Sequence, residues 1–245
     1  MIDVHTHIWL GRVEDNRKGI LYAAERYGCT RMGVSTLGGG HIPNEQNIED
    51  CNKATADFIR DYPGLIRGWC YVNPRHENAL DVAKRGMNDQ AMFGIKLWVA
   101  TKCDDPLVFP IAEYCCENDI PVLIHALDKS TGNLEFESRG INVRNLAKRY
   151  PELRIVMAHV GGNEYTGIRP IIDCPNVSVD ICGMIHRADT IEYAIERIGV
   201  KRIMYGTDLS AVAQYDSFVG RVTALDISDE DKERIFTTNA LDLGM

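Results

Sequence analysis

The sequence has none of the segments that usually mark exported, membrane-spanning or nucleic-acid-binding proteins. Residues Met1 to Leu10 contain three ionisable positions and no apolar run, and no stretch approaches the roughly 20 apolar residues of a membrane helix. Basic residues are outnumbered, since 27 lysines and arginines against 35 acidic residues give a net charge of −8, and no basic block is long enough to follow a phosphate backbone. We therefore expect a cytoplasmic protein that binds neither nucleic acid nor a membrane.

The eight cysteines do not form a single Cys-x-x-Cys pair, which leaves a zinc site made of four cysteines without support. A chain of 245 residues is also large enough to be stable without disulfides. We expect free thiols that behave as small buried hydrophobic side chains. These cysteines are Cys29, Cys51, Cys70, Cys103, Cys115, Cys116, Cys174 and Cys182.

Short apolar runs alternate with longer amphipathic stretches along the whole chain, which is typical of βα units around a parallel sheet. The predicted strands are Ile2 to Ile8, Arg31 to Thr36, Ile66 to Val72, Gly94 to Val99, Val122 to Ala126, Arg154 to Val160, Val177 to Ile181 and Arg202 to Thr207. The predicted helices are Gly19 to Tyr27, Ile48 to Tyr62, Glu77 to Asn88, Val108 to Asn118, Ile141 to Tyr150, Ile191 to Ile198 and, after the last strand, Lys232 to Leu243. This pattern and length predict one (β/α)8 TIM barrel over residues 1–245, without a second domain.

An open doubly wound sheet can be built from the same alternation. Such a sheet usually carries a glycine-rich phosphate-binding turn after its first strand. Here the first strand ends in His5-Thr6-His7, and Gly38-Gly39-Gly40 after the second strand lacks the GxGxxG spacing of a dinucleotide site. We therefore favour the closed barrel and interpret the glycine run as a loop.

His5 and His7 are two residues apart on the first predicted strand, so their side chains are expected to leave the same face, together with Asp3. One buried histidine is usually explained by packing. Two imidazoles at one strand end are costly to desolvate and favour a shared partner. The pair therefore indicates a metal site.

Three further strands end with a residue that can bind a metal, namely His125, His159 and Asp208. In a barrel the ends of the strands converge near the axis, so these side chains and the histidine pair are expected to meet. A mixture of imidazole and carboxylate ligands suits Zn²⁺ first, and then Mn²⁺, Fe²⁺ or Ni²⁺.

These motifs resemble the amidohydrolase superfamily, as do Ala158-His159-Val160-Gly161-Gly162, Gly206-Thr207-Asp208 and Thr238-Asn239-Ala240. The most similar branch is the amidohydrolase-related group (amidohydrolase 2) that includes aminocarboxymuconate semialdehyde decarboxylase-like enzymes. The resemblance covers the whole chain.

The resemblance implies that His5, His7, His125 and Asp208 bind a divalent metal. It also implies that His159 lies beside the metal and polarises the substrate or moves a proton. Lys96, on the fourth predicted strand, lies where some amidohydrolases carry a carboxylated lysine that bridges two metal ions. We favour the interpretation that Lys96 is a cation facing an acidic substrate, and a structural lysine is the third alternative, so the number of metal ions stays open between one and two.

Several loop residues after the predicted strands can contact a substrate. His41, His76 and His186 are candidates, although loop histidines are often merely solvated, and His76 is the weakest of the three. Arg12, Arg75 and Arg187 lie on similar loops, where a guanidinium group can bind a carboxylate, and the sequence does not choose among them.

This set of residues predicts a hydrolase that acts on an amide, lactone or related bond of a small molecule through metal-activated water. Asp208 would act as general base and then general acid, while His159 would stabilise developing negative charge. The alternative is a metal-dependent non-oxidative decarboxylase of an aromatic or muconate-type acid with the same ligands. A barrel without activity that serves as a binding protein is a third possibility, and the complete ligand set argues against it. A homodimer is expected from the frequency of this state among such enzymes.

Overall fold

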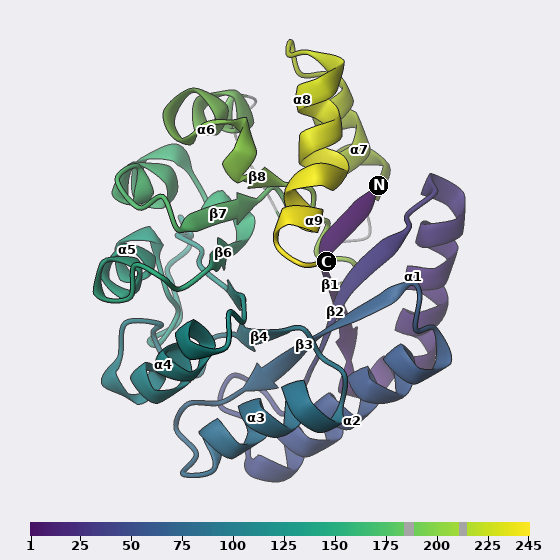
Figure 1. Cartoon of the computed structure of the whole chain (residues 1–245), viewed down its shortest axis with the longest axis vertical. Coiled ribbons are helices and arrows are strands. Elements are labelled where there is room, and N and C mark those ends of the chain that lie inside the picture. Colours follow the sequence, from purple (N-terminus) through teal and green to yellow (C-terminus); the bar gives the residue numbers. More distant parts are fainter. Residues whose placement is uncertain (184–188, 211–214) are drawn as a thin grey trace.

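A computed structural model describes residues 1–183, 189–210 and 215–245 of the chain. Eight parallel strands pair in the order of the sequence, and helices surround them (Figure 1). The strands are β1 (Ile2–Trp9), β2 (Arg31–Leu37), β3 (Ile66–Val72), β4 (Gly94–Leu97), β5 (Val122–Ile124), β6 (Ile155–Met157), β7 (Val177–Asp180) and β8 (Ile203–Met204). The predicted single (β/α)8 TIM barrel is confirmed.

The last strand returns to the first strand and closes the barrel. The backbone N–H of Val4 donates to the carbonyl of Tyr205 at 3.0 Å, and the N–H of Asp208 donates to the carbonyl of His5 at 2.8 Å. Thr6 also pairs in parallel with Leu209. This closure brings Asp208, near the end of the chain, beside His5 near its beginning.

Strands β6 and β8 are shorter than predicted. The ladder of β6 stops at Met157, because Ala158–Val160 forms a 3-10 turn in which His159 has a φ of 62°. The ladder of β8 stops at Met204, and Asp208 beyond it has a φ of 59°. The apolar runs thus continue past the regular strands into turns that carry the polar candidates.

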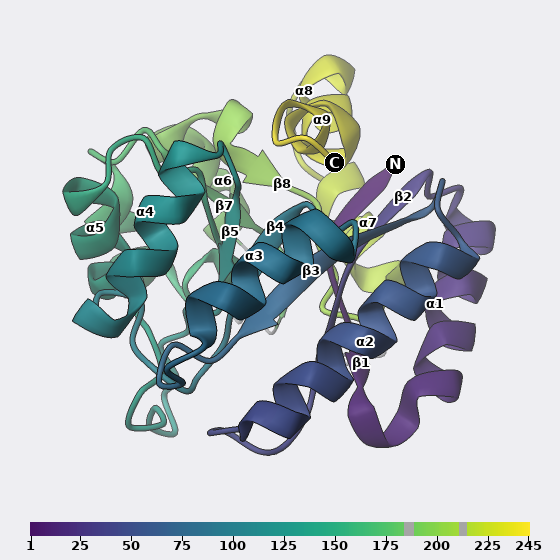
Figure 2. The ribbon, with the colours of Figure 1, turned by 60° about the horizontal axis from the view of Figure 1, so that its bottom comes forward.

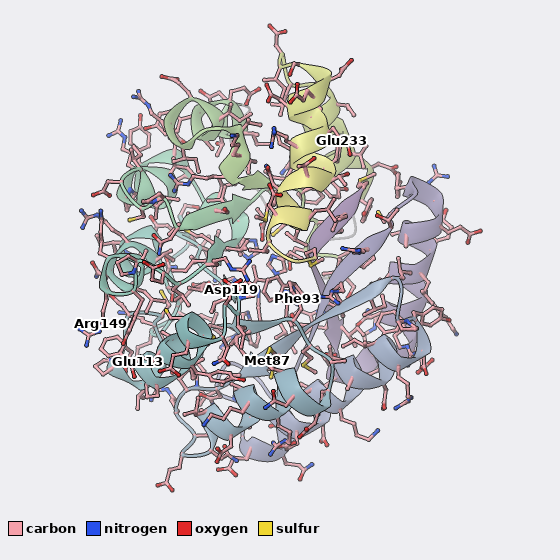
Figure 3. All side chains as sticks on the ribbon, viewed as in Figure 1. Met87, Phe93, Glu113, Asp119, Arg149 and Glu233 are labelled. Carbon is pink, nitrogen blue, oxygen red and sulfur yellow. The ribbon has the colours of Figure 1, made fainter. Side chains whose placement is uncertain are left out.

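The α-helices form the outer layer of the barrel, where Glu113 and Arg149 lie at the surface (Figure 3). Their bounds are α1 (Val13–Tyr27), α2 (Glu45–Asp61), α3 (Ala79–Asp89), α4 (Phe109–Glu117), α5 (Gly140–Arg149), α6 (Thr190–Ile198), α7 (Tyr215–Thr223), α8 (Asp229–Glu233) and α9 (Asn239–Asp242). Helix α1 begins at Val13 rather than at Gly19, because the residues before the apolar periodicity include Glu14 and Asp15, which favour a helix N-terminus.

Helix α7 was not predicted, and it takes the place that the sequence had suggested for Lys232 to Leu243. Tyr215 stacks on Tyr27 with ring centroids 4.6 Å apart, so α7 lies beside α1 and completes the outer ring. The sequence of α7 contains one glycine and three β-branched residues, which favour a helix only weakly, so the sequence did not indicate it.

The final segment is not one helix but a succession of α8, a π-helical turn (Arg234–Thr238) and α9. The end of this succession packs inside the amino end of the barrel. The inner apolar cluster consists of Ile2, Val4, Trp69, Leu123, Val156, Ala158, Met204, Ala240, Leu243 and Met245. The last residues of the chain therefore plug the end of the barrel opposite to the predicted site.

Three arginines at the amino ends of strands hold this plug in place. Arg67 donates to the carbonyl of Gly244 at 3.1 Å, Arg154 donates to the carbonyl of Leu243 at 3.0 Å, and Arg31 donates to the carbonyl of Met245. The two termini consequently lie close together (Figures 1 and 2). Guanidinium groups are well suited to the final carbonyls of a helix, which lack partners of their own.

Within residues 1–183, 189–210 and 215–245, no helix is both long enough and apolar enough to cross a membrane.

Candidate active site

A pocket of about 400 Å³ lies at the carboxyl ends of the strands. Its lining comes from the ends of strands and the loops that follow them, the position at which TIM barrels carry their chemistry. The lining residues are His7, Trp9, Leu37, Trp98, His125, Leu127, Asp128, Lys129, Ser130, Thr131, His159, Gly162, Gly183 and Asp208. The pocket therefore contains four of the residues predicted for the site.

His5, His7 and Asp208 form a compact group of metal-binding atoms beside this pocket. The Nε2 atoms of His5 and His7 are 2.9 Å apart. The Oδ1 atom of Asp208 lies 3.2 Å from Nε2 of His7 and 3.8 Å from Nε2 of His5. All three potential ligand atoms lie within 4.8 Å of one another, which satisfies the geometric requirement for a shared ion.

The outer nitrogens of both imidazoles are held by hydrogen-bond acceptors. Nδ1 of His5 lies 2.8 Å from Oδ2 of Asp180, and Nδ1 of His7 lies 3.3 Å from the carbonyl and 2.9 Å from the hydroxyl of Ser35. When Nδ1 donates to these groups, Nε2 carries a lone pair, and two lone pairs then point at the same space. A divalent cation relieves this repulsion, so the residues fit a metal.

The surroundings of His5 favour its neutral imidazole, which is the form that binds metals. Burial lowers the pKa of His5 well below its usual value, and nearby Lys96 and His7 lower it further. Burial raises the pKa of Asp208, but its hydrogen bond and charge interaction with His7, with contributions from His159 and His5, outweigh burial and hold the pKa well below its usual range. The group thus combines a neutral nitrogen ligand from His5 with an ionised carboxylate from Asp208.

His125 does not belong to this compact group. Its Nε2 lies 2.8 Å from Oε1 of Glu137, and its Nδ1 lies 3.0 Å from Nε2 of His159. Both ring nitrogens are therefore occupied by other side chains. The assignment of His125 as a fourth metal ligand stays a prediction.

His159 lines the pocket and lies within hydrogen-bond distance of two side chains. Its Nε2 contacts His125, and its Nδ1 lies 3.1 Å from Sγ of Cys182. Burial, with a smaller contribution from His125, lowers the pKa of His159 to about 4. A neutral imidazole at this position can donate or accept one hydrogen bond without carrying charge.

Asp180 and Cys182 are parts of the site that sequence reasoning missed. Both side chains are fully buried at the end of β7, and Asp180 binds Nδ1 of His5 through Oδ2 and the backbone N–H of His159 through Oδ1, at 2.8 and 2.9 Å. Sγ of Cys182 lies 3.1 Å from Nδ1 of both His5 and His159. The signal was available, because Asp180 is a polar residue at the end of a predicted strand, as His159 and Asp208 are.

Lys96 is fully buried, and its Nζ lies 2.9 Å from Nε2 of His5. It is absent from the described residues that line the pocket. Desolvation lowers its pKa to about 8, which places part of the population in the neutral form near neutral pH. The structure thus brings Lys96 to the metal-binding group, and its role toward a substrate or a second metal stays a prediction.

Unusual backbone geometry supports the positions of the polar residues. His159 and Asp208 both occupy the left-handed region, with φ values of 62° and 59°. Gly183, with a φ of 81°, approaches His159 so closely that a Cβ there would lie 2.7 Å from its Nδ1. Left-handed non-glycine residues cost free energy and cluster at functional sites, which supports this assignment.

Two tryptophans form an aromatic wall of the same pocket. The rings of Trp9 and Trp98 meet edge to face with centroids 5.9 Å apart, and His41 lies beside Trp98 at 6.0 Å. Indole faces favour flat unsaturated groups over flexible aliphatic ones. His41 is the only described loop histidine among the candidates that reaches this wall.

The remaining candidates lie elsewhere. Nε2 of His76 contacts the side chain of Asn73, Arg75 donates to the carbonyl of Ala100, and Arg12 is exposed beside Asp15. His186 and Arg187 lie outside the described residues.

The expectation that Asp3 shares the face of the histidine pair was wrong. The carboxylate of Asp3 accepts hydrogen bonds from the backbone of His5 and from the backbone and hydroxyl of Thr207. The register of β1 shifts between Asp3 and Thr6, which breaks the simple alternation of faces.

A protein-family model described as amidohydrolase matches residues 2–243 of the chain. Among characterised proteins, the chain is similar to a 2-keto-4-carboxy-3-hexenedioate hydratase from Sphingobium sp., with 23% identity over 77% of this chain and 68% of that protein.

The fold is also similar to solved structures. A 5-carboxyvanillate decarboxylase from Sphingomonas paucimobilis superposes with a TM-score of 0.77 and 13% identity over 99% of this chain and 98% of that chain. A 2,6-dihydroxybenzoate decarboxylase from Rhizobium has a TM-score of 0.74 and 17% identity over 99% and 97% of the two chains. A 5-carboxyvanillate decarboxylase from Novosphingobium aromaticivorans, complexed with manganese, has a TM-score of 0.74 and 20% identity over 93% and 80%.

Proposed function

The chain belongs to the amidohydrolase family, and from this premise we propose that it is a metal-dependent lyase that removes carbon dioxide from a small, flat, unsaturated carboxylic acid. The observation that carries the proposal is the combination, in one pocket, of the aromatic wall of Trp9 and Trp98 with the metal-binding residues His7 and Asp208. Two of the proteins with a similar fold are decarboxylases, which adds support. We therefore favour the lyase over the hydrolase that the motifs first suggested.

A divalent cation held by His5, His7 and Asp208 would supply the positive charge that binds an acidic substrate. We propose Zn²⁺ or Mn²⁺, because imidazole and carboxylate donors accept both ions and because manganese is present in a related decarboxylase. His125 remains the candidate for a fourth ligand. It would have to exchange its present contact with Glu137 or His159 for the ion.

Loss of carbon dioxide breaks the bond between the carboxylate carbon and the planar substrate. The electron pair stays on the substrate carbon, and a proton replaces carbon dioxide there. We assign the transfer of this proton to Asp208, which lines the pocket. Its ionised carboxylate would first accept a proton from water and then pass it to the substrate carbon. We assign a hydrogen bond to the developing negative charge to His159, which would exchange its contact with His125 for one with substrate.

A hydratase is the second candidate, and the similarity to the hydratase from Sphingobium sp. favours it. Hydration adds water across a conjugated double bond and retains every carboxylate. The same pocket can hold such a substrate, because an unsaturated keto acid is also negatively charged and is flat along its conjugated atoms. The two reactions therefore differ in the products and not in the binding requirements.

Product analysis tests the proposal. Protein loaded with Mn²⁺ or Zn²⁺ is incubated in deuterated water with 2,6-dihydroxybenzoate, 5-carboxyvanillate and 2-keto-4-carboxy-3-hexenedioate. We expect release of carbon dioxide and deuterium on the carbon that lost it. Addition of water without loss of carbon dioxide would establish the hydratase. Activity confined to lactones and amides would support the hydrolase instead.

Location in the cytoplasm and assembly as a homodimer remain proposals. The oligomeric state can be measured by light scattering during gel filtration of the metal-loaded protein.

A further inference from the structure

The loop between β5 and α5 brings a lysine into the pocket. Lys129 lines the pocket, its side chain is 32% exposed, and its Nζ lies 2.7 Å from Oε1 of Glu137. Of the described residues that line the pocket, Lys129 alone carries an ammonium or guanidinium group. This position differs from that of Lys96, which is fully buried against His5.

Glu137 fixes the loop and with it the position of Lys129. Its side chain is fully buried, and Oε1 contacts both Lys129 and Nε2 of His125, at 2.7 and 2.8 Å. Oε2 accepts hydrogen bonds from the side chain of Asn133 and from the backbone of Leu134, at 3.0 and 3.1 Å. Burial raises the pKa of Glu137, but these contacts stabilise its ionised form and lower the pKa to about 2.

The loop is also tied to its neighbours through the backbone. The N–H of Leu127 donates to the carbonyl of Ser138 at 3.0 Å, and the N–H of Asp128 donates to the carbonyl of Gly161 at 3.2 Å. Lys129 is consequently presented by an ordered segment and not by a long free loop. An ordered cation loses less entropy when it binds an anion than a mobile one does.

The charges around Lys129 leave it able to bind an anion. An ammonium group has three protons, and Glu137 accepts one of them. The nearby carboxylate of Asp128 is paired with Arg139 at 3.2 Å, which reduces its repulsion of a bound anion. Ser130 and Thr131 also line the pocket, and their hydroxyl groups are further potential donors.

We infer that Lys129 binds a second carboxylate of the substrate, so that the pocket selects flat dicarboxylic acids over monocarboxylic ones. This inference rests on the proposed function, because it takes the first carboxylate to lie at the metal-binding residues. The aromatic wall then contacts the flat part of the substrate, and the two ends of the molecule are bound by different positive charges. Glu137 acts as the positioning residue for Lys129.

Equilibrium binding of unreactive acids tests this inference without relying on turnover. Calorimetry measures the affinity of Mn²⁺-loaded protein for benzoate, isophthalate and terephthalate. We expect at least one dicarboxylate to bind the wild-type protein about 10- to 100-fold more tightly than benzoate, the range that a hydrogen bond between charged groups contributes. Lys129→Met should remove this preference and leave benzoate binding unchanged, whereas Lys129→Arg should retain most of it.

The matched control is Lys53→Met, because Lys53 is 74% exposed on α2 and pairs with Asp57 away from the pocket. This variant should keep the preference, and thermal unfolding should show that every variant is folded. Equal affinity for mono- and dicarboxylates in the wild-type protein, or a loss in Lys129→Met that affects benzoate equally, would overturn the subsite and leave the proposed lyase standing. Failure of all three acids to bind would overturn both the proposed substrate class and the subsite.

Discussion

At the amino end of the barrel, Trp69, Leu243 and Met245 pack apolar side chain against apolar side chain, whereas at the carboxyl end His5 and Asp180 meet through a hydrogen bond between buried polar groups. The side chains named at each end are buried. The amino end gains free energy from removing apolar surface from water. The carboxyl end must instead compensate the desolvation of each polar group with a partner.

This contrast indicates that the amino end of the barrel mainly stabilises the fold, whereas the carboxyl end carries the residues proposed for catalysis. Residues of the inner apolar cluster can be changed with consequences mainly for unfolding, since their contacts are not directional. Residues at the carboxyl end act on one another through ring nitrogens and carboxylates. Substitution of one of these residues therefore changes the hydrogen bonding and charge of the residue that it contacts. The following predictions separate the two ends, from the largest expected effect to the smallest.

The largest effect is expected from His5→Ala and His7→Ala. Both should remove most of a near-stoichiometric divalent metal and lower activity by more than about 100-fold, because even the outer partners of metal ligands change metal affinity by about 10- to 100-fold. Metal content is measured by mass spectrometry after gel filtration, and circular dichroism checks the fold. Full retention of metal in both variants would refute the ligand assignment.

The next pair of variants distinguishes Asp208 from His159. Asp208→Asn keeps the shape and some metal but loses the proton carrier, so the rate should fall by about 100-fold or more. His159→Asn should leave the metal content nearly intact and reduce the rate by roughly 100-fold through weaker stabilisation of charge. Metal loss in the His159 variant would make it a ligand and favour a two-metal site bridged by Lys96. Unchanged activity in the Asp208 variant would exclude its role in proton transfer.

Asp180→Asn tests whether the carboxyl end works through its outer hydrogen bonds. The amide can no longer hold Nδ1 of His5 as an anionic acceptor, so metal affinity should fall by about 10- to 100-fold. Titration with metal measures this change, and excess metal should restore most of the activity. Ser178→Ala on the same strand is the matched control, and an equal loss in both variants would show that β7 matters only for packing.

The smallest effect on activity is expected at the amino end. Leu243→Ala removes buried apolar volume from the inner cluster and should reduce the free energy of unfolding by about 2 to 3 kcal/mol. The unfolding midpoint should then drop by roughly 4 to 10 °C. Metal content and kcat/KM of the folded protein should stay within about twofold of wild type, because the sites are distant. A large loss of metal would show that the two ends are coupled.

Most strands of the barrel could be predicted from the sequence, because buried parallel strands are continuous apolar runs. The eight predicted strands are all present in the structure. Helix α7 was missed, because its glycine and three β-branched residues favour a helix only weakly. The final segment was predicted as an outer helix, because amphipathic spacing shows that a face is buried but not which surface covers it.

Sequence alone identified the strand ends that carry His5, His7, His159 and Asp208, because the order of elements in a barrel brings those ends together. It did not identify Asp180, whose importance depends on the 2.8 Å contact with Nδ1 of His5. Nor did it identify Lys129, which reaches the pocket because Glu137 and the backbone of a loop hold it there. Periodicity encodes which residues are buried, whereas the contacts between them depend on the closure, register and local turns that only the tertiary structure fixes.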